Sequence, residues 1–87
     1  MPARVQVFTT TYCPYCRRAT ALLDRRHIAY EEIDVTLDPQ ARAWLVRATG
    51  GRKTVPQIFI DGAGTGGCDD LHELDRRGKL IRLAKVP

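Results

Sequence analysis

The sequence predicts an α/β fold in a single domain spanning residues 1–87, with the elements in the order βαβαββα. Two observations indicate this class. Short apolar runs of strand length alternate with segments whose apolar residues recur at helical spacing. In addition, the first helix joins two such runs, and a strand–helix–strand unit makes its strands parallel, with a right-handed crossover. The chain is long enough to bury a modest core.

The first strand is expected at Val5–Phe8 and the first helix at about Pro14–Arg26. Proline suits the first helical turn, where its missing N–H has no intrahelical partner. Arginine in the last turn suits the negative end of the helix dipole. We interpret His27 as a surface residue that leaves the helix, in preference to a ligand. The second strand is expected at Ala29–Val35.

Asp38 is expected to cap the second helix, with Pro39 at its first position and Gly50-Gly51 after its end. We interpret Trp44 as a core residue, in preference to a substrate platform. The expected apolar stripe of this helix consists of Ala41, Trp44, Leu45 and Ala48.

The third strand is expected at Val55–Ile60, and a turn then leads to a weak fourth strand that ends at residue 65 or 66. The third helix opens within Gly66–Asp70, has Leu71 and Leu74 on its inner face, and ends at residues 76–78. The tail, Leu80–Ala84, is apolar enough for one or two further helical turns that pack back on the sheet.

A Cys-x-x-Cys sequence, Cys13-Pro14-Tyr15-Cys16, follows the first expected strand and lies at the start of the first expected helix. Cys13 should lie at the helix mouth and Cys16 one turn inside, on the same face. Free N–H groups and the helix dipole then favour a thiolate at Cys13, and such sites lower a thiol pKa from about 8.5 to roughly 3.5–7.5. Cys13 is therefore predicted to attack disulfides, and Cys16 to resolve the mixed disulfide.

Two alternatives for the cysteine pair are half of a zinc site and two ordinary reduced thiols. A structural zinc ion takes four ligands, and only Cys68, His27 and His72 remain, with no second Cys-x-x-Cys among them. We therefore expect no metal. Cys68 is interpreted as a packing residue, and the alternative is a thiol exposed enough to oxidise.

The charge balance and the apolar pattern restrict the partners. The net charge of +4 comes from 14 basic and 10 acidic residues, but the arginines are scattered in pairs along helices, so no nucleic-acid partner is expected. No apolar run approaches the ~18 residues of a membrane span, and no signal-peptide pattern is present. Three cysteines are too few for a secreted disulfide scaffold. We expect a cytoplasmic monomer without membrane contact.

The paired glycines Gly66-Gly67 stand before a helix mouth that offers free N–H groups, which is the composition of a carboxylate site. Asp69 beside them can accept an ammonium group. The γ-glutamyl end of glutathione has a carboxylate and an ammonium group. The backbone N–H groups would suit the carboxylate, and Asp69 would suit the ammonium group. The alternative is plain helix capping by Asp69 or Asp70, which explains the acids but not the two glycines.

Three motifs together give the chain a family resemblance: Cys13–Cys16, Thr54–Ile60 and Gly66–Leu71. In this order they resemble the dithiol (CPYC-type) glutaredoxins of bacteria, from about Val5 to Gly78. The resemblance implies a thioredoxin-like fold, in which helices flank a four-stranded mixed sheet. It also implies a cis Val55–Pro56 bond facing the sulfurs, and the alternative is a trans proline at a strand edge.

The resemblance further implies a glutathione-disulfide oxidoreductase that reduces protein disulfides and glutathione mixed disulfides, with glutathione as co-substrate. Cys13 and Cys16 would be catalytic, and Cys13 would carry the glutathionyl intermediate. The implied partners are glutathione and disulfide-containing or glutathionylated proteins. The implied glutathione-binding residues are Tyr15, Arg52, Thr54, Val55, Pro56, Gly67, Cys68 and Asp69.

The chain departs from the family pattern in two places. Many members have a lysine three residues before the first cysteine, where this chain has Thr10. In the family that lysine binds the glycyl carboxylate of glutathione, so the resemblance implies that Arg17, Arg47 or Arg52 supplies the charge here, or that glutathione binds less tightly. The segment Thr49–Thr54 is also about one residue longer than usual.

Two other functions remain as alternatives. One is a reductase fed by thioredoxin reductase, as in glutaredoxin-like hydrogen donors of ribonucleotide reductase. The other is a carrier that holds an iron–sulfur cluster between two chains through Cys13 and glutathione. Family members of that kind mostly have glycine or serine after the first cysteine, and Pro14 disfavours it.

Overall fold

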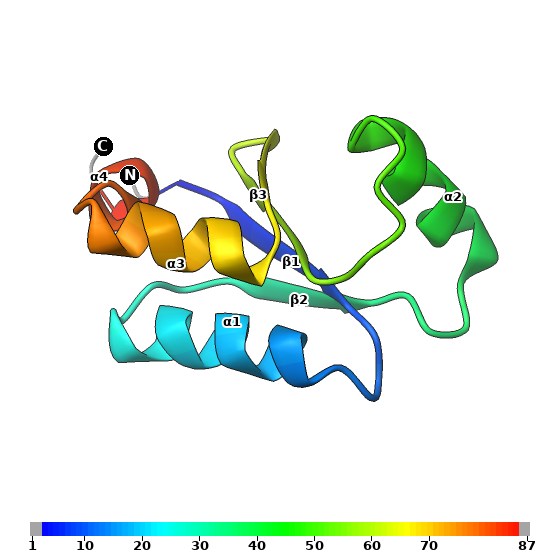
Figure 1. Ribbon diagram of the computed structural model, residues 1–87, viewed down its shortest axis with the longest axis horizontal. Helices are drawn as coiled ribbons and strands as arrows, with labels where there is room; N and C mark the ends of the chain where they lie inside the picture. The colour runs from blue at the N-terminus through cyan, green and yellow to red at the C-terminus, as the bar shows by residue number, and fades with distance from the viewer. Residues whose placement is uncertain (1–2, 86–87) are drawn as a thin grey trace.

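The computed structural model describes residues 3–85 and shows the predicted order of elements, followed by a short terminal helix (Figure 1). The strands are β1 (Val5–Thr9), β2 (Glu31–Asp34), β3 (Gln57–Ile60) and β4 (Ala63–Gly66), and the helices are α1 (Pro14–Arg25), α2 (Pro39–Ala48), α3 (Cys68–Arg76) and α4 (Leu80–Lys85). One mixed sheet has the strand order β2-β1-β3-β4. β1 and β2 are parallel, whereas β3 is antiparallel to both of its neighbours. The α/β, thioredoxin-like prediction is confirmed.

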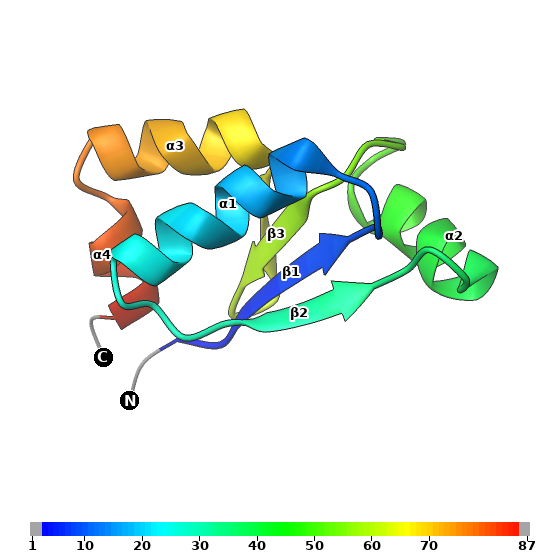
Figure 2. The same cartoon turned by 90° about the horizontal axis from the view of Figure 1, so that it is seen from below.

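The sheet divides the core into two clusters because successive strand residues point to opposite faces. Val7 and Ile58 point toward α1 and α3, which lie side by side over one face (Figure 2). Phe8 and Phe59 point to the other face, where they meet Leu45 of α2. The larger cluster therefore supports the helix that carries the two cysteines.

Two strands are shorter than predicted. β2 begins at Glu31 and ends at Asp34, not at residues 29 and 35, because only these four residues pair with β1. Val35 follows the strand and is fully buried without belonging to it. β3 begins at Gln57 and not at Val55, because Pro56 has no N–H to donate to a ladder.

The apolar stripe predicted for α2 is only partly confirmed. Leu45 is buried, but Ala48 is exposed, which contradicts the prediction for that residue. Trp44 is 45% exposed, although its ring lies 5.5 Å from the ring of Phe8 and 5.7 Å from that of Phe59. The reason is the position of α2 at the end of the sheet, so that it covers few strand residues (Figure 1).

α1 ends one residue earlier than predicted, at Arg25, and Arg26 becomes its C-cap. Arg26 then binds Asp75 of α3 through two hydrogen bonds of 2.7 and 2.9 Å. His27 is exposed and has a positive φ, consistent with its interpretation as a surface residue. The predicted terminal helical turns are confirmed as α4, and no helix within residues 3–85 is long and apolar enough to cross a bilayer.

Candidate active site

Cys13 is the N-cap of α1 and Pro14 is its first residue, as predicted. The backbone N–H of Cys16 donates to the Cys13 sulfur over 3.1 Å. The two sulfurs are joined as a disulfide, with their Cα atoms 5.1 Å apart. Cys16 is fully buried, whereas Cys13 is half-buried. An external sulfur therefore has access to Cys13 and not to Cys16.

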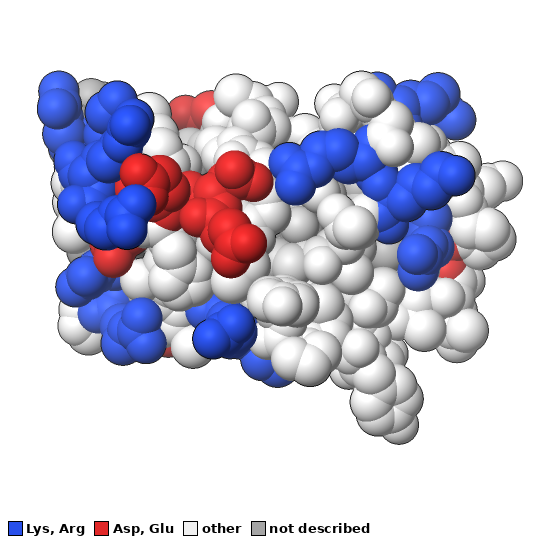
Figure 3. All heavy atoms as spheres, viewed as in Figure 1, with Lys and Arg blue, Asp and Glu red and all other residues white. Residues whose placement is uncertain are grey.

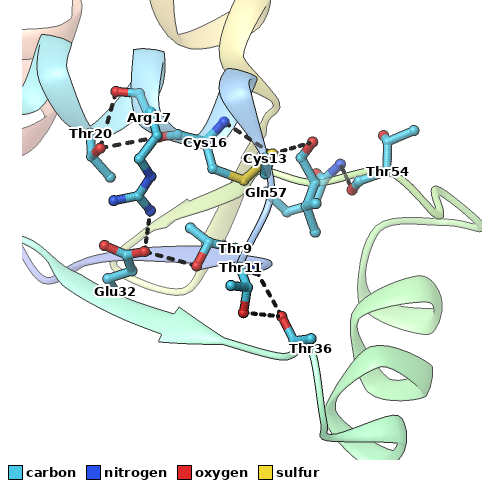
Figure 4. The surroundings of a disulfide bond; sticks show 11 residues. Thr9, Thr11, Cys13, Cys16, Arg17, Thr20, Glu32, Thr36, Thr54 and Gln57 are labelled. Atoms are coloured by element: carbon cyan, nitrogen blue, oxygen red, sulfur yellow. Dashed lines mark hydrogen bonds and ion pairs between the residues drawn. A yellow bond between two sulfur atoms is a disulfide. The ribbon is translucent and has the colours of Figure 1, made fainter.

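The Val55–Pro56 peptide bond is cis, so this prediction is confirmed and the trans alternative is wrong. The carbonyl oxygen of Val55 lies 3.7 Å from the Cys13 sulfur. Gln57 is almost fully buried, and its side-chain amide donates to the carbonyl of Thr54 over 3.0 Å (Figure 4). This hydrogen bond fixes the segment before β3. An extended substrate on Cys13 would therefore lie next to the Val55 backbone.

A groove of about 420 Å³ opens between the start of α1, the cis-proline segment and the start of α3. All eight residues that the resemblance implied for glutathione lie along it, together with Asp70. Its lining consists of Tyr15, Arg52, Thr54, Val55, Pro56, Gly67, Cys68, Asp69 and Asp70. The fold thus brings three motifs, far apart in the sequence, into one groove.

Two acidic residues in the first turn of α3, Asp69 and Asp70, have different contacts. Asp70 accepts the backbone N–H of Gly67 over 2.9 Å, and so it is the capping residue. Gly66 has a φ of +99°, and a Cβ at that position would overlap the Asp70 carboxylate. The cap therefore requires glycine at residue 66. The capping alternative holds for Asp70, and the exposed Asp69 is left to line the groove.

Among the three arginines considered as carboxylate partners, only Arg52 lines the groove. Its guanidinium lies 3.5 Å from a carboxylate oxygen of Asp70. Arg17 is paired with Glu32 on β2, and Arg47 lies in the last turn of α2. Figure 3 shows acidic side chains gathered over α3, and Lys and Arg side chains toward α2. Further Lys and Arg side chains lie on the other side of the acidic group, so basic side chains flank the acidic ones on this face.

Cys68 is buried, and its sulfur lies 3.5 Å from Nδ1 of His72. Burial raises the pKa of the Cys68 thiol, and the nearby Asp69 carboxylate adds to the effect. Both causes disfavour the thiolate, which agrees with a packing residue whose backbone lines the groove. Within residues 3–85, no three His, Cys, Asp or Glu side chains come together as a metal site.

Two contacts at the site were missed from the sequence. Asp70 was considered from the sequence only as a possible helix cap, and its place in the groove was not predicted. Glu32, which binds Arg17 and Thr9, had no signal in the sequence. Its contacts depend on how β2 lies beside β1 and α1, and no local pattern encodes that arrangement.

Residues 5–64 match the sequence model described as Glutaredoxin. The chain belongs to the glutaredoxin family. A glutaredoxin of Pseudomonas aeruginosa is 50% identical over 79 residues, which cover 91% of this chain and 93% of that protein. Glutaredoxin 3 of Escherichia coli K12 is 45% identical over 83 residues, covering 95% and 99% of the two chains.

Solved glutaredoxin structures share the fold. The solution structure of the Brucella melitensis glutaredoxin has a TM-score of 0.86 and 45% identity, with 97% of this chain and 90% of that chain covered. A buckwheat glutaredoxin–glutathione complex has a TM-score of 0.86 and 36% identity, with 94% and 76% covered. With Cys13 and Cys16 at disulfide distance, this glutaredoxin is a thiol–disulfide oxidoreductase.

Proposed function

We propose that this glutaredoxin uses glutathione to reduce protein disulfides and glutathione mixed disulfides through Cys13 and Cys16. The observation that carries the proposal is the groove beside Cys13, which is lined by all eight residues expected to bind glutathione. The buckwheat glutaredoxin of the same fold is a complex with glutathione, which supports this choice of co-substrate. Because the reaction consumes reduced glutathione, we place it in the cytoplasm, where glutathione keeps thiols reduced.

In the proposed monothiol reaction, the Cys13 thiolate attacks the glutathione sulfur of a mixed disulfide. The protein thiolate leaves and takes up a proton, and Cys13 is now bonded to glutathione. A second glutathione thiolate then attacks the glutathione sulfur of this intermediate. The products are glutathione disulfide and the Cys13 thiolate, so one reduced glutathione is consumed for each protein thiol released, and the other half of the glutathione disulfide comes from the mixed disulfide.

In the proposed dithiol reaction, Cys13 attacks a protein disulfide and the Cys16 thiol resolves the mixed disulfide. The protein leaves as a dithiol, and a Cys13–Cys16 disulfide remains, as in the structure. Two glutathione molecules then reduce that disulfide. The burial of Cys16 fits a thiol that reacts only within the protein.

The groove supports a role for each end of glutathione. The Val55 backbone would pair with the central cysteinyl residue, and Tyr15 would form a wall. The first turn of α3 offers N–H groups to the γ-glutamyl carboxylate, and Asp69 offers a carboxylate to its ammonium group. Arg52, which lines the groove, would bind the glycyl carboxylate of glutathione.

A glutathione-coupled assay on a small mixed disulfide tests the proposal with wild type, Cys13→Ser and Cys16→Ser. Cys13→Ser should lose all turnover. Cys16→Ser should keep reduction of the mixed disulfide and lose the dithiol reduction of a protein disulfide. Turnover by Cys13→Ser, or turnover by wild type with thioredoxin reductase but not with glutathione, would contradict the proposal.

A further inference from the structure

Arg17 follows the cysteine pair directly, and its side chain is held by β2. It lies four residues after Cys13, so the two side chains share one side of α1. Helical side chains lean toward the N-terminus, which would bring an unrestrained guanidinium toward the Cys13 sulfur. Instead, Arg17 forms an ion pair with Glu32. Figure 4 shows the Arg17 side chain running toward Glu32, with the cysteine sulfurs on another side.

Glu32 is itself held by a second contact. The hydroxyl of Thr9 on β1 donates over 3.0 Å to Oε2 of Glu32, the same oxygen that Arg17 binds. Thr9 is fully buried, and the Glu32 side chain is 33% exposed against 56% for Arg17. The carboxylate is therefore the anchored member of the pair, and the arginine is the member that would move if the pair were broken.

We propose that Glu32 is a positioning residue that keeps the Arg17 guanidinium on β2 and so limits the positive charge beside the Cys13 sulfur. Other charged groups that border the site are Arg18 on α1, Arg52 before β3, and Asp69 and Asp70 on α3. Asp34 at the end of β2 and the Tyr30 hydroxyl before that strand also interact electrostatically with Arg17. A limited positive charge keeps the Cys13 thiolate reactive, because the nucleophilicity of a thiolate falls as the pKa of its thiol falls.

The test is alkylation of the reduced protein by iodoacetamide as a function of pH, with the modified cysteine identified by mass spectrometry. The variants are Glu32→Gln, Arg17→Gln and the double variant. Glu31→Gln is the matched control, because Glu31 is the neighbouring residue of β2 but pairs with Arg4. The pH series reports the titration of Cys13, which a purely structural role of Glu32 would leave unchanged.

Below the midpoint of the titration, Glu32→Gln should be alkylated about threefold faster than wild type, the size expected for a surface charge interaction. The same change in an Arg17→Gln background should have a clearly smaller effect, and Glu31→Gln should match wild type. Equal acceleration with and without Arg17 would overturn the proposal, because Glu32 would then act through its own charge. No acceleration would overturn it as well.

The inference depends on Cys13 being the attacking sulfur, which is part of the proposed function. Alkylation of Cys16 in place of Cys13 would contradict the proposed function, whereas alkylation of Cys13 without a response to Glu32→Gln would contradict this inference alone. If Glu32→Gln fails to fold, Thr9→Val removes the second contact without changing the charge. It should shift the titration in the same direction by a smaller amount, and no shift would overturn the proposal.

Discussion

The three cysteines of this chain have the same side chain but lie in three different environments, and these environments give them different reactivity. Cys13 caps a helix and is open to substrate, Cys16 is buried one turn further along, and Cys68 is buried at the start of another helix. The helix mouth favours a thiolate at the first position, and burial favours the neutral thiol at the third. These environments support the proposal that Cys13 is the attacking sulfur.

Asp69→Asn tests the amine site at the scale of a single residue. The variant should raise the KM for glutathione about two- to fivefold, because an exposed charge pair contributes that much to binding. Its stability should not change, since the cap of α3 is Asp70. Steady-state kinetics with varied glutathione gives the measurement.

Asp70→Ala is the matched comparison at the next position. Loss of the cap should lower the free energy of unfolding by about 1 kcal/mol, measured by urea denaturation. An unchanged KM in Asp69→Asn would remove the amine-binding role from Asp69.

Contacts between elements hold the active-site helix against its neighbour. Arg26 at the end of α1 donates two hydrogen bonds to Asp75 of α3, and the two helices pack side by side. The pair lies at the opposite end of α1 from Cys13. The contact therefore stabilises the helix that carries the two active-site cysteines without contributing charge to the site.

Asp75→Asn tests this contact through its pH dependence. Arg26 lowers the pKa of Asp75 below its ordinary value of 3.8, so the folded protein favours the ionised carboxylate. The stabilisation is complete above that pH and is lost as the pH falls through the folded pKa. At pH 7 the variant should unfold about 2–5 °C lower than wild type by circular dichroism.

The difference in Tm between Asp75→Asn and wild type should shrink below pH 3.8. Glu73→Gln is the control, because Glu73 forms its ion pairs within or just beyond α3, with Arg76 and Arg77. A Tm difference that is as large at pH 2 as at pH 7 would show that the Asp75 charge is not the cause.

At the scale of the whole molecule, stability comes from two apolar clusters on opposite faces of one sheet. The cluster under α1 and α3 contains most of the fully buried side chains among residues 3–85, including Leu22, Leu23 and Leu71. The cluster under α2 is smaller and is partly open at Trp44. The face that carries the active-site helix is therefore the more firmly packed.

Leu22→Ala tests the larger cluster, with Leu37→Ala as a control in the same residue type. Leu22 is fully buried and Leu37 is 95% exposed. Leu22→Ala should lower the free energy of unfolding by about 2–5 kcal/mol, measured by urea denaturation. Leu37→Ala should change it by less than about 0.5 kcal/mol. Similar losses in both variants would contradict the two-cluster description.

Local chemistry made much of this protein predictable from its sequence. Helix starts at Pro14 and Pro39 depend on cap residues and a missing N–H, which are properties of adjacent residues. The same holds for the placement of Cys13 at the helix mouth. Strand ends were less predictable. β2 ends where its residues no longer have partners on β1, and the sequence of β2 alone does not show where that is.

By itself, the sequence determined the α/β order, the cysteine pair and its asymmetry, because these follow from periodicity and spacing along the chain. Only the tertiary structure decided that Arg52 lines the groove while Arg17 turns away to Glu32. It alone decided that the Trp44 side chain stays 45% exposed. The physical reason is that charge pairing and burial depend on distances between segments remote in sequence, which exist only once the sheet and helices have packed.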